Sequence, residues 1–255
     1  MIRLGLIGAA TYAPTYRGED AERQPGCFHG TAFAATYNGF DEEKSKQWQW
    51  TFVRARKRLE GATVVKLWDP DPVWARRLAD TCSIPEVCDR PEACWQDVDG
   101  VILVDEGSGR QGRWAEDPLR AGVPVFCDKP LAMTGREAAR LARTVRETGT
   151  PFFSASSLRF VPDILELAES VSELGPVPLA TAVCGNELVY YGIHALSMHY
   201  AVCGGGAVSC RNVGQPDRNV VRVRFEDGRD LVLLVAERDY MRPGYEIGLF
   251  GRQGW

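Results

Sequence analysis

The chain of 255 residues has the composition of a globular protein with a mildly acidic balance. Hydrophobic residues make up 45% and charged residues 25%, with a formal net charge of -4, which excludes a disordered or fibrous chain. No basic block stands without acidic neighbours, which argues against binding to nucleic acid or to a membrane surface.

Strands and helices alternate over the first 150 residues. Short apolar runs predict strands at 2–7, 62–68, 100–104 and 123–127, and helical spacing predicts helices at 29–37, 41–59, 73–81, 113–121 and 134–147. The segment 12–28 is rich in glycine, proline and charge, and is expected to be an irregular loop. The alternation implies a parallel sheet with right-handed crossovers. Residues 1–150 are therefore expected to form a doubly wound, Rossmann-type nucleotide-binding domain.

The texture changes after Pro151. An extended segment is expected at 152–160, helices at 162–174 and 192–202, and strands at 177–184, 208–213, 220–225, 231–236 and 245–250. A hairpin turn at 226–229 joins two of these strands. Residues 151–255 are therefore expected to form a second, α+β domain with a mostly antiparallel sheet, so that the fold class is α/β overall.

The first strand leads into Gly8-Ala9-Ala10-Thr11. A strand followed by a glycine turn and a helix holds nucleotide diphosphates through its backbone N–H groups. These four residues are therefore candidate cofactor-binding residues. Ala10 and Pro14 stand where further glycines are usual, so a junction without a ligand is an equal alternative.

Asp69 follows the second predicted strand. A carboxylate there accepts hydrogen bonds from an adenosine ribose and repels a 2′-phosphate, which favours NAD over NADP. The alternative is that Asp69 caps the next helix, with Pro70 at its first position. The gap from Gly8 to Asp69 exceeds the usual separation of about 20–30 residues, and the segments 12–28 and 41–59 account for the excess.

The segment 121–132, AGVPVFCDKPLA, resembles a block found after the fourth or fifth strand in the glucose-fructose oxidoreductase/inositol dehydrogenase (Gfo/Idh/MocA) family. Further stretches resemble the family in the same order, namely VKLWDPD at 65–71, LRFVP at 158–162, GPV at 175–177, YYGIH at 190–194 and YEIGLFG at 245–251. The resemblance spans nearly the whole chain.

The resemblance implies a Rossmann domain and an α/β domain whose large open sheet is often used for oligomerisation. It also implies a nicotinamide cofactor and a sugar, polyol or related substrate. By position, Lys129 would lie between substrate and nicotinamide, and His194 would face the reacting hydroxyl. Asp105 and Asp128, which follow the third and fourth strands, join Lys129 as candidate cofactor-binding residues.

The chemistry of alcohol oxidation suits these residue types. A histidine titrates near neutral pH and can take the hydroxyl proton as hydride leaves the carbon. A lysine can stabilise the developing alkoxide or relay the proton. The alternatives are that His194 is an ordinary helix-start histidine and that Lys129 is a surface lysine after a strand.

Several positions depart from the family pattern. Tyr190 replaces an aspartate before His194, and a tyrosine, with a reference pKa of about 10, is a poor substitute for a carboxylate. Tyr190 remains a candidate catalytic residue. Asp128 replaces the usual glutamate, and Gln111 stands near a common histidine. The chain ends after a strand where relatives continue, so a compact variant with a shortened second domain is expected.

Three residues are candidates for substrate binding. Tyr191 belongs to the YYGIH stretch. Arg159 can bind a carboxylate or a hydroxyl-rich substrate through its donor fork, or can pair with an acid at the domain interface. His29 and Phe33 form an H-x-x-x-F pattern that a subset of the family shares. His29 either points into the active cleft or packs on the first helix.

Three functions compete on this sequence. The first is an NAD(P)-dependent dehydrogenase or reductase of a sugar, polyol or similar compound. The second is an enzyme that retains its cofactor for a net non-redox elimination or hydrolysis through a transient ketone. The third is a nucleotide- or ligand-sensing protein without turnover. A small-molecule substrate and a homo-oligomer, a dimer or tetramer, are the expected partners.

The compartment is expected to be the cytoplasm. The N-terminal apolar run is too short for a secretory signal, and no stretch approaches the roughly 18 apolar residues of a membrane span. The eight cysteines form no Cys-x-x-Cys pair, so no metal site is expected. The cysteines are expected to be reduced, buried thiols.

Overall fold

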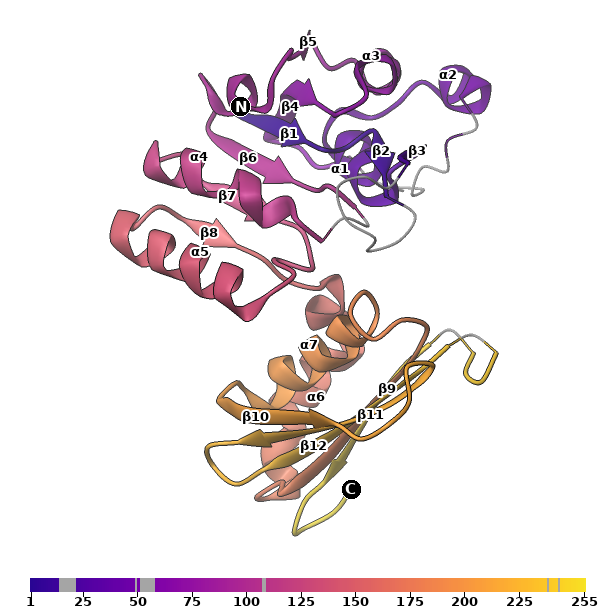
Figure 1. The fold of residues 1–255 in the computed structure, drawn as a ribbon, viewed down its shortest axis with the longest axis vertical. Helices are drawn as coiled ribbons and strands as arrows, with labels where there is room; N and C mark the ends of the chain where they lie inside the picture. The colour runs from indigo at the N-terminus through magenta and orange to yellow at the C-terminus, as the bar shows by residue number, and fades with distance from the viewer. Residues whose placement is uncertain (14–21, 49, 51–57, 107–108, 238, 243) are drawn as a thin grey trace. The chain divides into compact units, whose positions relative to one another are not determined.

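The computed structural model describes residues 1–13, 22–48, 50, 58–106, 109–237, 239–242 and 244–255 (Figure 1). The chain divides into two units, Met1–Ser154 and Ala155–Trp255. Each is described by itself.

The first unit is built on a parallel sheet of six strands in the order β5-β4-β1-β6-β7-β8. These are β1 (Ile2–Ile7), β4 (Ala62–Trp68), β5 (Glu86–Val87), β6 (Gly100–Leu103), β7 (Val125–Cys127) and β8 (Phe152–Phe153). The chain runs outward from β1 to β4 on one side and returns to β6 on the other. The strand order therefore reverses between β1 and β6, which confirms the predicted Rossmann-type sheet.

Helices cover both faces of this sheet. They are α1 (Phe28–Asn38), α2 (Glu42–Gln47), α3 (Pro72–Thr81), α4 (Glu116–Arg120) and α5 (Gly135–Thr148), with 3₁₀ turns η1 (Pro91–Trp95) and η2 (Gln111–Trp114). Alternate residues of β6 enter different cores. Ile102 packs in a cluster with Ala34 of α1 and Leu78 of α3, whereas Leu103 packs with residues of α4 and α5. The sheet is therefore buried on both sides, as parallel sheets are.

Two predicted helices of this unit differ from the structure. The helix expected at 41–59 is described only as α2, which Asp41 caps and which ends at Gln47; residues 49 and 51–57 lie outside the described residues. The helix expected at 113–121 is wrong as one element, because it is split into η2 and α4. Pro118 has no N–H to donate to a continuous helix, which explains the break.

The loop expected at 12–28 is only partly irregular. Its described residues contain a short antiparallel pair, β2 (Thr11–Tyr12) with β3 (Gln24–Pro25), and the start of α1. Residues 14–21, including Pro14, lie outside the described residues.

The second unit packs helices on a five-stranded sheet in the order β10-β11-β12-β9-β13. The strands are β9 (Leu179–Gly185), β10 (Ala207–Asn212), β11 (Arg218–Phe225), β12 (Asp230–Ala236) and β13 (Tyr245–Phe250). Only the β9–β12 pairing is parallel, so the predicted, mostly antiparallel sheet is confirmed. Every second residue of β11 is buried, as in a sheet with one covered face.

The helical elements of this unit are η3 (Ser157–Phe160), α6 (Pro162–Ser170), η4 (Val171–Leu174) and α7 (Gly192–Cys203). The expectation of an extended segment over 152–160 is wrong at its second half. The Ser156 hydroxyl accepts the N–H of Leu158 at 3.2 Å and caps the 3₁₀ turn η3 there.

Among the described residues, no helix is long and apolar enough to cross a membrane. All eight cysteines are described and are free thiols, and six of them are buried.

Candidate active site

Two glycines shape the junction between β1 and α1. Gly8 has φ +72°, and a Cβ there would lie 2.8 Å from the backbone nitrogen of Asp105. Gly30 lies in the first turn of α1, where a Cβ would come 2.3 Å from the carbonyl oxygen of Ala9. Gly8 thus permits the tight turn, and Gly30 permits close packing of α1 on the strand, which are the first and third roles of a dinucleotide-binding glycine motif. The motif is therefore divided by an insertion, and Gly30 was missed.

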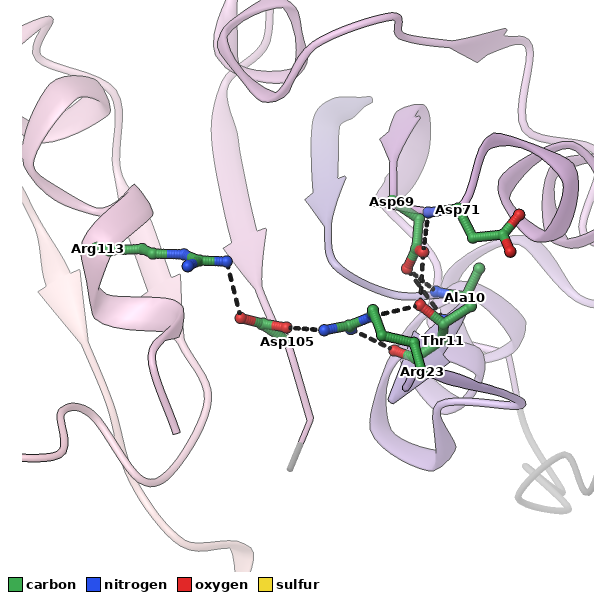
Figure 2. A network of polar contacts seen from close by, with 7 residues as sticks. All are labelled: Ala10, Thr11, Arg23, Asp69, Asp71, Asp105 and Arg113. Atoms are coloured by element: carbon green, nitrogen blue, oxygen red, sulfur yellow. Dashed lines mark hydrogen bonds and ion pairs between the residues drawn. The ribbon is translucent and has the colours of Figure 1, made fainter. Parts of the chain in front are cut away.

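The buried carboxylate of Asp69 accepts hydrogen bonds from the turn after β1. Its side chain is 3% exposed. Its Oδ2 accepts the backbone N–H groups of Ala10 at 2.8 Å and Thr11 at 3.0 Å, and its Oδ1 accepts the Thr11 hydroxyl at 2.7 Å (Figure 2). Burial raises the pKa of Asp69, although these hydrogen bonds oppose the shift. The alternative that Asp69 caps α3 is wrong, because Asp71 is the N-cap.

Asp105 lies beyond the carboxyl end of β6, and its carboxylate forms ion pairs with the guanidinium groups of two arginines. Nη1 of Arg23 is 2.8 Å from its Oδ1, and Nη2 of Arg113 is 3.5 Å from its Oδ2. Arg23 also donates from Nε to the Thr11 hydroxyl at 2.8 Å and from Nη2 to the Thr11 carbonyl at 2.9 Å. Figure 2 shows Arg23 between Asp105 and Thr11. The candidate cofactor residues Ala10, Thr11, Asp69 and Asp105 therefore belong to one polar network.

The carboxyl end of β7 carries a second group of charges. Nδ1 of His29 lies 2.5 Å from Oδ2 of Asp128, and the His29 backbone N–H donates to Glu106 at 3.2 Å. Burial lowers the pKa of His29, but the hydrogen bond and charge of Asp128, together with Glu106, outweigh it, so the pKa is raised. His29 therefore lies on α1 with its ring directed to Asp128.

Lys129 is buried beside this pair, with 4% of its surface exposed. Burial lowers the pKa of Lys129, and the charges of Asp128 and Glu106 oppose the shift. The alternative of a surface lysine is therefore wrong. A buried amine with a lowered pKa is the form in which lysine exchanges protons most readily.

Gln111 fixes the backbone on both sides of Lys129. Its Nε2 donates to the carbonyl of Asp128 at 2.9 Å and to the carbonyl of Pro130 at 2.7 Å. Gln111 is itself 1% exposed. Gln111, which stands near a position where the family commonly has a histidine, thus holds the lysine segment in place.

In the second unit, His194 lies among aromatic side chains at the start of α7. Its Nδ1 is 2.6 Å from the Ser156 hydroxyl. Its ring centroid lies 6.3 Å from that of Tyr191 and 5.5 Å from that of Tyr245, and Tyr190 packs 5.5 Å from Tyr191. Burial raises the pKa of Tyr245 to about 12. The predicted Tyr190, Tyr191 and His194 are therefore brought together by their own unit.

Arg159 lies half-buried on η3. Its side chain makes no ion pair with any residue that the structure describes, and its two predicted roles stay predictions.

Sequence reasoning missed four side chains at these places, namely Arg23, Glu106, Gln111 and Ser156. Glu106 directly follows Asp105, a predicted site residue, and Gln111 stands near a position where the family commonly has a histidine. Nothing local in the sequence distinguishes Arg23 or Ser156.

A family model described as "Oxidoreductase family, NAD-binding Rossmann fold" matches residues 42–156. Among curated proteins, the inositol 2-dehydrogenase of Paracoccus denitrificans is 29% identical over 134 residues, a match that covers 49% of this chain and 38% of that protein. The inositol 2-dehydrogenase of Gluconacetobacter diazotrophicus is 34% identical over 91 residues, covering 34% of this chain and 27% of that protein. The chain thus matches well under half the length of these relatives.

Solved structures share the fold across the whole chain. The apo scyllo-inositol dehydrogenase of Lactobacillus casei superposes with a TM-score of 0.75 at 15% identity, covering 100% of this chain and 74% of that one. The sequence motifs, the family model and the inositol 2-dehydrogenase relatives agree. The family match over residues 42–156 and the inositol 2-dehydrogenase relatives support the resemblance of this chain to the Gfo/Idh/MocA family of oxidoreductases with an NAD-binding Rossmann fold.

Proposed function

We propose that this chain is an NAD-dependent oxidoreductase that transfers hydride to or from a sugar, polyol or related hydroxylated compound. One observation carries the proposal. Lys129 is a buried amine with a lowered pKa at the carboxyl end of a parallel strand, which is where open α/β sheets bind their ligands. A buried amine at such an edge, with its pKa lowered by burial, is typical of a group that exchanges protons with a ligand.

The relatives support the substrate class. Two curated relatives are inositol 2-dehydrogenases, and inositol is a cyclic polyol. An oxidoreductase of Agrobacterium radiobacter, solved in complex with NAD+, L-tartaric acid and magnesium, superposes with a TM-score of 0.69 at 15% identity, covering 98% of this chain and 72% of that one. A hydroxylated substrate and NAD are accordingly the proposed ligands of this chain.

The residues of the first unit fit a nicotinamide dinucleotide. Gly8 and Gly30 lie where a Cβ would collide with neighbouring backbone, so the tight turn after β1 and the close packing of α1 are those of a dinucleotide-binding motif. Asp69 and Asp71 place two carboxylates just after β4, which disfavours a 2′-phosphate and favours NAD over NADP. When bound, the nicotinamide supplies the hydride acceptor or donor.

Side chains near the carboxyl end of β7 are the proposed acid–base groups. In the oxidising direction, Lys129 as the neutral amine would take the proton of the reacting hydroxyl as hydride leaves its carbon. The ammonium so formed would stabilise the negative charge that develops on that oxygen. Asp128 holds His29 by the contact at 2.5 Å, and the hydrogen bond and charge of this carboxylate raise the pKa of His29. In the second unit, His194 and Tyr190 are the proposed contributors to turnover, and Arg159 and Tyr191 to substrate binding.

Titration of the purified chain with NADH and NADPH, followed by nicotinamide fluorescence, tests the cofactor assignment. NADH is expected to bind more tightly than NADPH. A preference for NADPH would contradict the NAD assignment, and binding of neither would contradict the proposed function. Bound NAD+ that is never reduced in the presence of any polyol would instead favour a protein without turnover.

We also propose that the second unit associates with another copy of the chain. The sheet face opposite α6 and α7 carries exposed apolar residues, including Leu179, Val220 and Phe250. Patches of this kind mark interaction surfaces. Analytical ultracentrifugation is expected to find a dimer or tetramer, and a monomer at all concentrations would contradict this.

A further inference from the structure

We propose that Arg23 is the side chain that binds the diphosphate of the dinucleotide. This inference rests on the proposed function and extends it to a residue of the insertion between β1 and α1. Neither the sequence motifs nor the family resemblance pointed to Arg23.

Backbone groups that commonly bind a diphosphate are already engaged within the protein. In Rossmann folds, N–H groups of the first turn and of the following helix start point at the phosphates. Here four of these groups donate to acceptors of the chain itself: those of Ala10 and Thr11 to Asp69, that of His29 to Glu106, and that of Gly30 to Cys27. Recognition of the diphosphate therefore calls for another donor.

Arg23 lies where that donor is needed. Its guanidinium links Thr11, in the turn after β1, to Asp105, which follows β6 (Figure 2). The strand order reverses between β1 and β6. Open α/β sheets bind nucleotides beyond the carboxyl ends of the strands at this reversal. The guanidinium thus spans the position that the fold reserves for the diphosphate.

The geometry leaves Arg23 able to bind an anion without giving up its present contacts. A guanidinium has five N–H donors, and three contacts hold this one, on Nε, Nη1 and Nη2. The other two N–H groups have no acceptor among the residues that the structure describes. The side chain is 20% exposed, so these donors are accessible on a group whose orientation is already fixed.

The two buried carboxylates near Arg23 each have other hydrogen-bond or ion-pair partners. Asp69 is satisfied by backbone N–H groups and the Thr11 hydroxyl. Asp105 keeps a second guanidinium, that of Arg113 at 3.5 Å. A diphosphate approaching Arg23 can therefore draw on its positive charge while each buried carboxylate keeps another partner.

The competing role for Arg23 is purely structural, as a brace between the insertion and β6. The two roles differ in what they predict for truncated ligands. A brace affects every ligand of the site alike. A diphosphate-binding residue affects ADP and NADH, which carry the diphosphate, and spares adenosine, which does not.

Calorimetric titration of ADP, adenosine and NADH into the wild type and into Arg23→Gln separates the roles. Arg23→Lys restores the charge without the fork, and Arg120→Gln, an exposed arginine of the same unit, is the matched control. Arg23→Gln is expected to weaken the binding of ADP and NADH about 10- to 100-fold, because a charge-assisted contact to the diphosphate is lost. Adenosine is expected to change less than about twofold, with Arg23→Lys recovering part of the loss.

Equal weakening of ADP and adenosine, unchanged ADP binding or tighter ADP binding in Arg23→Gln would overturn the inference. If the wild type binds NADH and only these comparisons fail, the proposed function stands without this residue. If the wild type binds neither NADH nor ADP, the proposed function fails as well.

Discussion

The carboxylate of Asp69 holds Thr11 at two points, by its backbone N–H at 3.0 Å and its hydroxyl at 2.7 Å. A residue chosen from the sequence as a ribose ligand thus also fixes the shape of the turn after β1. Since the carboxylate accepts from Ala10 and Asp71 as well, the end of β4 and the turn after β1 form one rigid unit.

Asp69→Asn is expected to lower the free energy of unfolding by about 2–3 kcal/mol, because an amide NH2 would face N–H donors in a buried position. NADH affinity is expected to fall with it. Chemical denaturation and NADH titration check this, with the exposed Asp80→Asn as control. Unchanged stability would mean that the hydrogen bonds to Asp69 do not hold the turn.

Gly30→Ala is expected to destabilise the first unit by about 2 kcal/mol or more, because its Cβ would collide with the backbone of Ala9. Gly135→Ala is the matched control, since Gly135 also lies in a first helical turn but has no atom within 4 Å of the new Cβ. That substitution is expected to stabilise the chain by about 0.5–1 kcal/mol. Thermal unfolding that ranks the two variants in the opposite order would contradict the close packing of α1.

The ion pair of His29 with Asp128 predicts a pH-dependent contribution to stability. Because the pKa of His29 is raised in the folded chain, the contribution is present in full below the pKa of the unfolded histidine and is lost as pH rises through the folded pKa. Between pH 6 and pH 9, chemical denaturation is expected to show a larger fall in the free energy of unfolding for the wild type than for His29→Gln. An equal fall in the two proteins would contradict a stabilising ion pair between His29 and Asp128.

His199 predicts the opposite dependence for the second unit. It is fully buried on α7, its ring lies 5.1 Å from that of Phe225, and neither ring nitrogen has a hydrogen-bond partner among the described residues. Burial, with the charge of Arg229, lowers the pKa of His199 to about 4. A depressed histidine pKa leaves stability intact above the unfolded pKa and reduces it as pH falls.

Between about pH 6.5 and 4, the wild type is therefore expected to lose about 3 kcal/mol relative to His199→Leu. Urea denaturation across this range measures the difference. Equal acid sensitivity of the two proteins would show that His199 does not remain neutral.

The order of strands and helices was largely predictable because the strands are buried apolar runs, such as β1 and β4, whose ends carry glycine or aspartate. Helix continuity was less predictable. The split at 113–121 depends on one missing N–H at Pro118, and η3 depends on one hydroxyl, that of Ser156. Such features are single hydrogen bonds that a hydrophobic pattern does not record.

The candidate residues at strand ends were predictable for a related reason. Asp69, Asp105 and Lys129 each follow a recognisable strand, and parallel strands bring their ends to one edge. Arg23 and Gly30 lie beyond an insertion, so their approach to Thr11 and Ala9 depends on how the chain returns. No spacing rule in the sequence contains that return path.

Turnover tests the central claim most directly. The wild type, Lys129→Met and Lys129→Arg would be incubated with NAD+ and a panel of inositols, sugars and linear polyols, with nicotinamide absorbance as the readout. The account predicts that the wild type reduces NAD+ with at least one of these compounds. Lys129→Met should lose about 10²- to 10⁴-fold in rate while still binding NADH. Full activity in Lys129→Met, or a wild type that binds NADH and oxidises no polyol, would contradict it.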